Sequence, residues 1–321
     1  MFVGQNGDAA WIATNYKNAA SFHHLDVCAQ CFAQNSEGPL DFCRFTACPL
    51  RSHSDYMMTQ GARVSPLTSI PGWHISLNRG ELMHSGPLGA MQDTIGSALE
   101  ELCLEGVWDG QDLSPWEFRR QVQLNCAFED FVFWSQSANQ QHTLKRFTRL
   151  QFCMRTASGS FPCLKGKAHN SLVLCRWLDS VCSAFKNKSS YCRLRWQILW
   201  AWVAMFDICL SSDPDFLTPA EAKQFDDATG ILLHGSKVLA RLCASDSVAR
   251  WKLRPKLHTI WHINQDVQNS MRNPRAWWTF KDEETMGKLS TIARATHPSS
   301  MNVRSLERWC VQFFEYMEVD V

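Results

Sequence analysis

The sequence predicts a helix-rich α/β protein of 321 residues. Trp73, Ile75 and Leu77 alternate with polar residues, which is the period of a half-buried strand. Apolar residues over 91–103 then recur at helical spacing. Most of 105–265 shows the same helical periodicity. A strand that is followed by a helix, in a chain with many further helices, is typical of mixed α/β architectures.

The N-terminal part predicts a strand and then an irregular, cysteine-rich region. A short strand is predicted to end near Asp8, although Gly4 and Gly7 lower its strand propensity. Residues 21–57 are rich in Cys and His and show little periodicity, which predicts a loop held by local contacts or by a metal ion. Residues 1–20 lack the apolar segment of a signal peptide, so the 14 cysteines are expected to be reduced thiols in the cytosol or nucleus.

The rest of the chain is predicted to be mainly helical. Thr218, Pro219 and Glu221 predict a capped helix start, with Pro at the first helical position. The apolar stretch 196–210 is shorter than the roughly 20 residues that span a bilayer, so we expect a buried core helix. Helices are predicted over 115–138, 168–186, 190–210, 218–243, 254–268 and 302–317, and one more is predicted to begin at the acidic cluster 282–284.

Two pairs of cysteines predict a zinc site in the loop. Cys28 and Cys31 have the C-x₂-C spacing of a zinc half-site, in which two thiolates on a tight turn reach one tetrahedral ion. Cys43 and Cys48 supply a second pair and complete a Cys₄ set, or His24 replaces one of the cysteines. The alternative is a group of buried or free thiols without a metal.

Two histidines near residue 260 have ligand spacing of their own. His258 and His262 are four residues apart and therefore share one face of a helix. The segment HTIWH lacks the Glu of a zinc-protease motif. The two histidines are therefore predicted either to support an active site or to be core and capping residues.

Local basic segments are the candidates for nucleic-acid contact, since the formal net charge of +1 alone demands no such partner. Lys and Arg interleaved with aromatic residues can follow a phosphate backbone. The alternative is an ordinary solvated face. The candidate residues are Lys165, Lys167, Arg250, Lys252 and Lys256.

Several blocks of this sequence, taken together and in order, resemble RNase H-like transposase-derived proteins. That family occurs in many copies in some protist genomes and is distantly similar to plant CACTA-type elements. The blocks are GDAAW at 7–11, the CAQC pair with SHSDYM at 52–57, IPGWHISLNRGELMHSGPLGAMQDTIGSAL at 70–99, FPCLKGKAHNSLVL at 161–174, and WKLRPKLHTIWH with RNPRAWWTFKDEETMGKLSTIA within 251–293.

The resemblance implies an RNase H-like mixed-sheet core that is interrupted by a large helical insertion. The core would take 1–104 and 250–321, with a late acidic helix in the second part, and the insertion would take 105–249. Three carboxylates would then hold two divalent ions, Mg²⁺ or Mn²⁺, against a DNA phosphodiester.

Matched position by position, the resemblance assigns the catalytic acids to Asp8, Glu81 and Glu283, with Glu284 as a neighbour of the third. His84 falls on the His of the family's D-x-x-H pattern, whereas Glu81 stands where that pattern has Asp. The longer side chain displaces the carboxylate, which puts the activity of this copy in doubt because catalytic groups tolerate only about 0.5 Å of error.

Three functions follow from this sequence. The first is a transposase-like, metal-dependent cleavage and transfer of DNA strands, or a degenerate descendant of such an enzyme. The second is a non-catalytic DNA- or protein-binding relic with a zinc-stapled loop, and the third is a helical scaffold without a nucleic-acid role. Expected partners are DNA and further copies of the chain, with no membrane and no small-molecule cofactor, in a nuclear protein.

Overall fold

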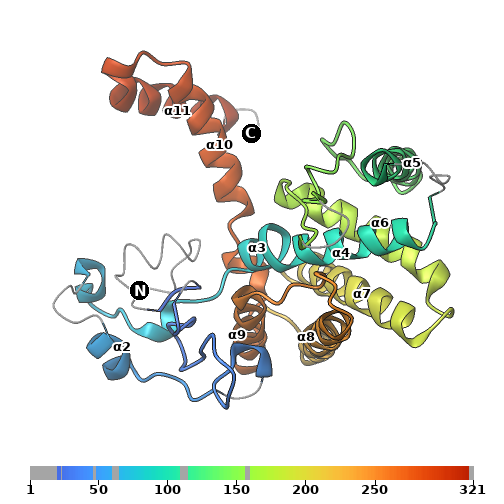
Figure 1. The fold of residues 1–321 in the computed structure, drawn as a ribbon. Helices are drawn as coiled ribbons and strands as arrows, with labels where there is room; N and C mark the ends of the chain where they lie inside the picture. Colours follow the sequence, from blue (N-terminus) through green and yellow to red (C-terminus); the bar gives the residue numbers. More distant parts are fainter. Residues whose placement is uncertain are drawn as a thin grey trace. The chain divides into compact units, whose positions relative to one another are not determined.

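The computed structural model describes residues 20–22, 24–45, 48–59, 65–108, 115–155 and 160–317. Within the helices of this part, the side chains of residues 59, 281–284, 286, 302 and 312–317 are not described. The described chain is built from helices that are joined by loops (Figure 1).

The prediction of an RNase H-like mixed sheet is wrong for the described residues. They contain no β-strand, and extended pairing is limited to isolated bridges such as Cys31 with Leu50. The predicted strand at 73–77 is instead a loop that leads into a 3₁₀ turn, η3 (Ile75–Leu77). Trp73 and Ile75 do alternate into a small core with Tyr56, but no neighbouring strand pairs with them in the described chain. The strand predicted to end near Asp8 lies outside the described residues.

The predicted helices are confirmed with boundaries shifted by a few residues at most. The α-helices are α2 (His53–Thr59), α3 (Leu82–Ser85), α4 (Met91–Leu104), α5 (Trp116–Ser137), α6 (Ala168–Phe185), α7 (Ser190–Ser211), α8 (Pro219–Ser245), α9 (Pro255–Ser270), α10 (Phe280–Arg294) and α11 (Met301–Met317). Short 3₁₀ turns are η1 (Phe42–Arg44), η2 (Pro66–Ser69), η3, η5 (Pro274–Trp277) and η6 (Pro298–Ser300), and η4 (Gly86–Ala90) is a π turn between α3 and α4.

Helix α8 begins as the sequence predicts. The Thr218 hydroxyl accepts the backbone N–H of Glu221, and the Glu221 carboxylate accepts the backbone N–H of Thr218 at 2.7 Å. This capping box satisfies two N–H groups that the first turn leaves unpaired. Apolar faces of α6, α7 and α8 then pack on one another around buried side chains such as Trp202 and Phe225.

Helix α4 packs on α5, α6 and α7. The extended segment 161–167 also passes close to it. The backbone of Leu164 donates to the carbonyl of Gln92 at 3.0 Å, and the Gln92 side chain donates to the carbonyl of Gly166. A Cβ at Gly96 would lie 2.5 Å from the backbone nitrogen of Cys163. Only glycine lets the two backbones come this close.

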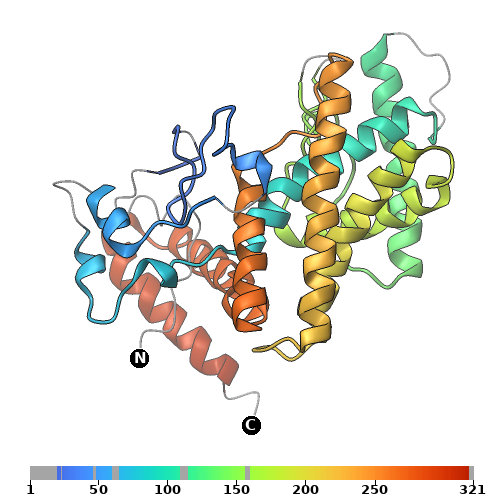
Figure 2. The same cartoon turned by 90° about the horizontal axis from the view of Figure 1, so that it is seen from below.

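The described chain falls into two compact units. The larger unit runs to Trp277, and the smaller unit from Trp278 onward contains α10 and α11. Within the larger unit, α9 lies between the N-terminal segment and α8 in both views (Figures 1 and 2). None of the described helices has the length and apolar character needed to cross a membrane. The segment 196–210 is part of α7, where Trp202, Met205 and Phe206 are buried.

Candidate metal centre

The structure gathers one group of three or more metal-ligating side chains among the residues that it describes. All ligand atoms of this group lie within 4.8 Å of one another, and three of its four residues are buried. The group consists of Cys28, Cys31, His258 and His262. It could hold a metal ion such as zinc.

A tight turn presents the two thiols of this group. The backbone N–H of Gln30 donates to Cys28 Sγ at 3.3 Å, which folds the turn around the sulfur. Cys31 then enters an isolated antiparallel bridge with Leu50. Arg51 stabilises the turn, because its Nε donates to the carbonyl of Cys31 at 2.9 Å.

Helix α9 presents the two imidazoles. Pro255 occupies the first turn, where a missing N–H costs nothing, and Met271 ends the helix in a left-handed conformation. Ile260, Ile263 and Val267 are buried with the core. His258 and His262 are one turn apart on an adjacent face, so both side chains point to the N-terminal segment.

The distances are close to those of a tetrahedral zinc site. Cys31 Sγ lies 3.1 Å from His258 Nε2, and His262 Nε2 lies 3.3 Å from Cys28 Sγ and 3.4 Å from Cys31 Sγ. Bonds of about 2.3 Å to sulfur and about 2.0–2.1 Å to nitrogen place S and N about 3.6 Å apart at the tetrahedral angle. For these three pairs, an ion would need only a few tenths of an ångström of expansion.

Protonation of the two thiols is strongly uneven. A hydrogen bond with the Cys31 thiol holds the pKa of Cys28 well below its ordinary value, against the effect of burial, and the neighbouring His262 lowers it further. The same hydrogen bond with Cys28, together with burial, raises the pKa of Cys31. A metal ion bound here would displace the thiol protons, as thiolate ligation requires.

The chemistry of the donors favours metal binding over nucleophilic catalysis. A Cys–His nucleophile needs one thiol, one base and room for a substrate. Here both imidazoles direct Nε2 at two thiols, and Cys31, His258 and His262 are buried. Two sulfur and two nitrogen donors in a tetrahedral set suit zinc.

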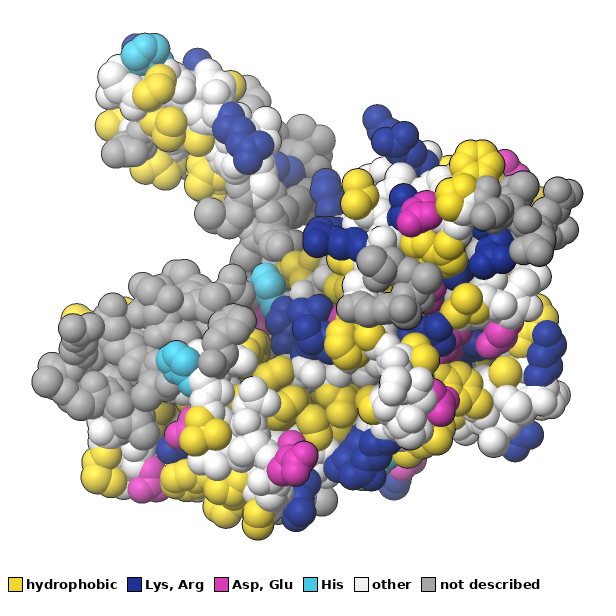
Figure 3. Space-filling view, in the orientation of Figure 1, with side chains coloured by type: hydrophobic (Ala, Val, Ile, Leu, Met, Phe, Trp, Pro, Cys, Tyr) yellow, Lys and Arg dark blue, Asp and Glu magenta, His cyan; other side chains and the backbone are white. Residues whose placement is uncertain are grey.

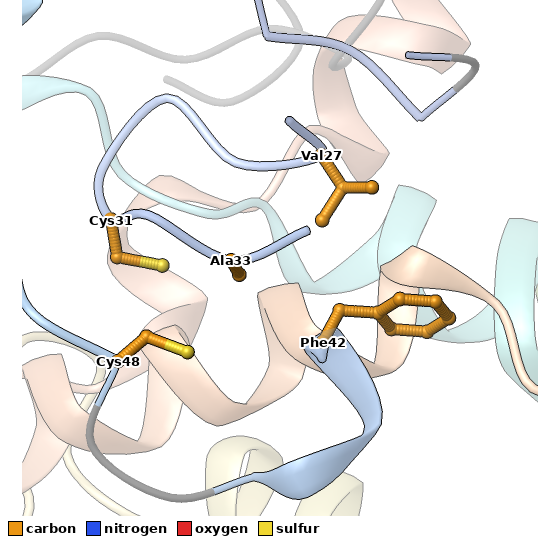
Figure 4. Close-up of a cluster of buried hydrophobic side chains, with 5 residues drawn as sticks. All are labelled: Val27, Cys31, Ala33, Phe42 and Cys48. Atoms are coloured by element: carbon orange, nitrogen blue, oxygen red, sulfur yellow. The ribbon is translucent and has the colours of Figure 1, made fainter. Parts of the chain in front are cut away.

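The predicted zinc ligands are thus brought together only in part. Cys28 and Cys31 belong to the group, whereas Cys43, Cys48 and His24 do not. Cys48 is buried beside Cys31 in a small apolar cluster with Val27, Ala33 and Phe42 (Figure 4). Burial raises the pKa of Cys43 to about 12, with the Asp41 carboxylate adding to the effect. His24 is exposed.

The histidines that complete the group were visible in the sequence but were assigned to a different role. H-x₃-H is the usual second half of a Cys₂His₂ zinc site whose first half is C-x₂-C. Cys31 and His258 are 227 residues apart, so the two halves appear as unrelated features in the sequence.

Of the three predicted catalytic acids, only Glu81 has a described side chain. Asp8 lies outside the described residues, and the side chains of Glu283 and Glu284, near the start of α10, are not described. Glu81 is buried and caps α3, where its carboxylate accepts the backbone N–H groups of Met83 and His84. No group of carboxylates suited to Mg²⁺ occurs in the described chain. The expectation of bound Mg²⁺ or Mn²⁺ therefore has no support there.

His84 and Glu81 form a close pair. His84 Nδ1 lies 2.8 Å from the Glu81 carboxylate, and the imidazole is about a quarter exposed, at 23%. This contact fixes the ring against the start of α3. The pair therefore stabilises the turn between Gly80 and α4. This turn packs closely on Thr259 of α9, and that close approach requires a glycine at position 80.

The five predicted DNA-contacting residues divide into two sets. Lys165, Lys167 and Lys252 are exposed. Lys256 donates from Nζ to the carbonyls of His84 at 2.7 Å and Leu88 at 2.9 Å. The fifth residue, Arg250, is 3.8 Å from the buried carboxylate of Glu101.

No protein-family model, no curated protein and no solved structure matches this chain in the comparisons with known proteins.

Proposed function

We propose that the chain is a zinc-binding helical protein in which one Zn²⁺ fastens the N-terminal segment to α9. The proposal rests on the group of two thiols and two imidazoles within 4.8 Å. A site with four protein ligands leaves no position for a substrate, which is typical of structural rather than catalytic zinc.

Besides the proposed ion, a small apolar cluster and polar contacts such as those of Arg51 with Asp26 and with the carbonyl of Cys31 hold the N-terminal segment. Between residues 26 and 50 the apolar cluster consists of Val27, Cys31, Ala33, Phe42 and Cys48 (Figure 4). Cys28 and Cys43 pack against this cluster. Such a small cluster stabilises a segment weakly against the entropy of ordering it. A metal staple supplies the missing free energy.

Metal analysis of the purified full-length chain tests this proposal. We expect about one equivalent of zinc per chain, and less than about 0.2 equivalents in His262→Ala. Cys43→Ser is the matched control, because this thiol is close to the site in sequence but outside the group of ligands. Zinc below about 0.2 equivalents in the wild type, after growth with added zinc, would contradict the proposal.

A second candidate function is DNA binding by an exposed basic surface of the same unit. Lys165 and Lys167 follow Phe161 in the extended segment beside α4, and the Lys252 ammonium lies 5.6 Å from the centre of the Phe161 ring. Lys and Arg side chains gather near the middle of the face drawn in Figure 3. Exposed lysines beside an exposed aromatic ring suit a phosphate backbone and its bases.

Salt-dependent binding distinguishes this surface from a solvated face. Replacement of Lys165, Lys167 and Lys252 by Gln is expected to weaken binding of single-stranded DNA and to reduce the slope of log K against log salt by about 2, at roughly 0.7 per phosphate contact. Lys223→Gln, on the exposed side of α8, is the control. Equal binding by the triple variant and the control would exclude this surface.

A further inference from the structure

The candidate metal centre holds two thiols, one on a residue of intermediate exposure and one on a buried residue. Cys28 is intermediate in exposure, whereas Cys31 is fully buried at 0%. Both sulfurs lie within 4.8 Å of each other and of the two imidazoles. Cys28 is thus the partly exposed residue of the group, and its side chain carries one of the two sulfurs.

The other ligands are shielded. His258 and His262 are 2% and 5% exposed. Imidazole is not oxidised under conditions that oxidise thiolates, so the chemistry of the centre with an oxidant is that of its two sulfurs. Loss of both sulfurs would leave only two of the four donors.

We propose, on the basis of the proposed zinc site, that this centre is a redox-sensitive lock: peroxide converts Cys28 and Cys31 to a disulfide, releases Zn²⁺ and frees the N-terminal segment from α9.

The reaction balances with a hydroperoxide as the oxidant. The Cys28 thiolate attacks one oxygen of H₂O₂, forms Cys28–SOH and releases hydroxide. The Cys31 thiolate then attacks the sulfur of Cys28–SOH, which forms the S–S bond and expels a second hydroxide. Two electrons pass from the two sulfurs to the peroxide oxygens, and Zn²⁺ leaves with its charge unchanged.

Most other thiols of the described chain are poor competitors for the oxidant. Burial raises the pKa of Cys103, Cys163 and Cys182 to about 12 each. Such thiols hold almost no thiolate at neutral pH, and thiolate is the species that reacts with peroxide. Cys310 is exposed on α11, in the smaller unit, and serves as an internal comparison.

Cys48 is the thiol that could divert the reaction. It is buried beside Cys31, and the two side chains face the same small cluster (Figure 4). It contributes no ligand atom to the metal group. A disulfide between Cys31 and Cys48 is therefore the specific competing product.

The test treats the zinc-loaded, full-length protein with stoichiometric H₂O₂ while a chromophoric chelator reports free Zn²⁺. We expect release of about one equivalent per chain, a Cys28–Cys31 disulfide in peptide maps, and recovery of binding after a dithiol reductant and zinc are added. Cys48→Ser and Cys43→Ser are expected to release zinc at rates within about twofold of the wild type.

Three outcomes would overturn the proposal. One is retention of zinc while Cys310 is oxidised. Another is loss of zinc with Cys28 and Cys31 still reduced, and the third is a Cys31–Cys48 disulfide that disappears in Cys48→Ser together with zinc release. Zinc content before oxidation is measured separately. A chain that never holds zinc contradicts the proposed function itself, whereas a zinc-loaded chain that resists peroxide contradicts only the redox lock.

Discussion

The pairing of buried carboxylates shows how single residues affect the stability of this fold. Glu101, on α4, accepts hydrogen bonds from the Tyr191 hydroxyl and from Trp251 Nε1 at 2.7 Å, and Arg195 lies 3.3 Å from its second oxygen. Burial raises the pKa of Glu101, and these partners counteract the rise. Asp179, on α6, has fewer partners: its Oδ1 is buried without a hydrogen-bond partner among the described residues. A buried carboxylate without full pairing costs stability once it ionises.

Asp179 therefore predicts a pH-dependent stability. Burial raises its pKa from 3.8 to about 6, and the nearby Asp207 adds to the rise. The folded chain binds this proton between those pH values and the unfolded chain does not, so the free energy of unfolding falls as pH rises through that window, by at most about 3 kcal/mol.

Replacement by the uncharged amide should remove this loss. Asp179→Asn is expected to raise the free energy of unfolding by about 1–2 kcal/mol at about pH 8 and to leave it nearly unchanged at about pH 4. Urea denaturation at the two pH values measures the difference. Asp227→Asn, in an exposed pair with Lys223, is the control and should change little. A gain that is equal at both pH values would mean that ionisation is not its cause.

Single residues also show how far the sequence could predict the site. C-x₂-C at Cys28 and Cys31 and H-x₃-H at His258 and His262 were both recognisable as ligand spacings. Their combination was not, because it depends on which helix lies against the loop, and local spacing carries no information about that. Cys43 was predicted as a ligand only because it is near Cys28 and Cys31 in the sequence. In the structure it packs against the small apolar cluster, outside the ligand group.

At the scale of elements, the extended segment 161–167 and α4 depend on one close approach. A Cβ at Gly96 would come within 2.5 Å of the carbonyl carbon of Pro162, which is backbone and cannot move aside cheaply. Gly96→Ala is expected to lower the free energy of unfolding by about 1–3 kcal/mol. Gly230, inside α8, has nothing within 4 Å of such a Cβ.

Gly230→Ala is thus the matched substitution with the opposite expected sign. It should raise the free energy of unfolding by about 0.5–1 kcal/mol, because Ala has the higher helix propensity. Chemical denaturation of both variants measures the pair. Destabilisation by both substitutions to a similar extent would show that backbone contact at Gly96 is not the cause.

Helices α4 and α7 are joined by a buried ion pair. Arg195 is 0% exposed and donates to Glu105 at 2.9 Å as well as to Glu101. Arg195→Met should cost about 3–5 kcal/mol, because it removes the buried guanidinium that pairs with the buried Glu101 carboxylate. Lys223→Met breaks an exposed pair on α8 and should cost less than about 0.5 kcal/mol. Thermal unfolding of the two variants measures the contrast, and similar losses would contradict it.

Elements also differ in how well the sequence predicts them. The long helices were predicted because their apolar periodicity extends over many residues, and the start of α8 because Thr218 and Glu221 form a capping box. The alternation at Trp73, Ile75 and Leu77 wrongly predicted a strand, because three alternating residues also fit a loop that buries every second side chain. A strand needs a partner, and a segment of this length does not show whether one exists.

At the scale of the whole molecule, an ion at the candidate metal centre would close a very long loop. Cys31 and His258 are 227 residues apart, so a bound ion restricts most of the larger unit in its unfolded state. The chain-entropy relation for a cross-link over a loop of this length gives a stabilisation on the order of 5 kcal/mol. The ion would also fix the N-terminal segment against α9, which in turn packs on α8 (Figure 2).

Removal of zinc should therefore lower the stability of parts of the larger unit that lie far from the ligands. A chelator is expected to lower the Tm of the full-length protein by roughly 10 °C, at about 2–4 °C per kcal/mol for a unit of this size. Proteolysis should then begin between residues 24 and 51, because a small apolar cluster and the polar contacts of Arg51 are left to hold that segment. His258→Ala should show the low Tm from the start and no further response to the chelator, whereas Cys43→Ser should respond as the wild type does. If the chelator strips all zinc without changing the Tm or the first cleavage sites, the ion does not connect the two ends of this unit.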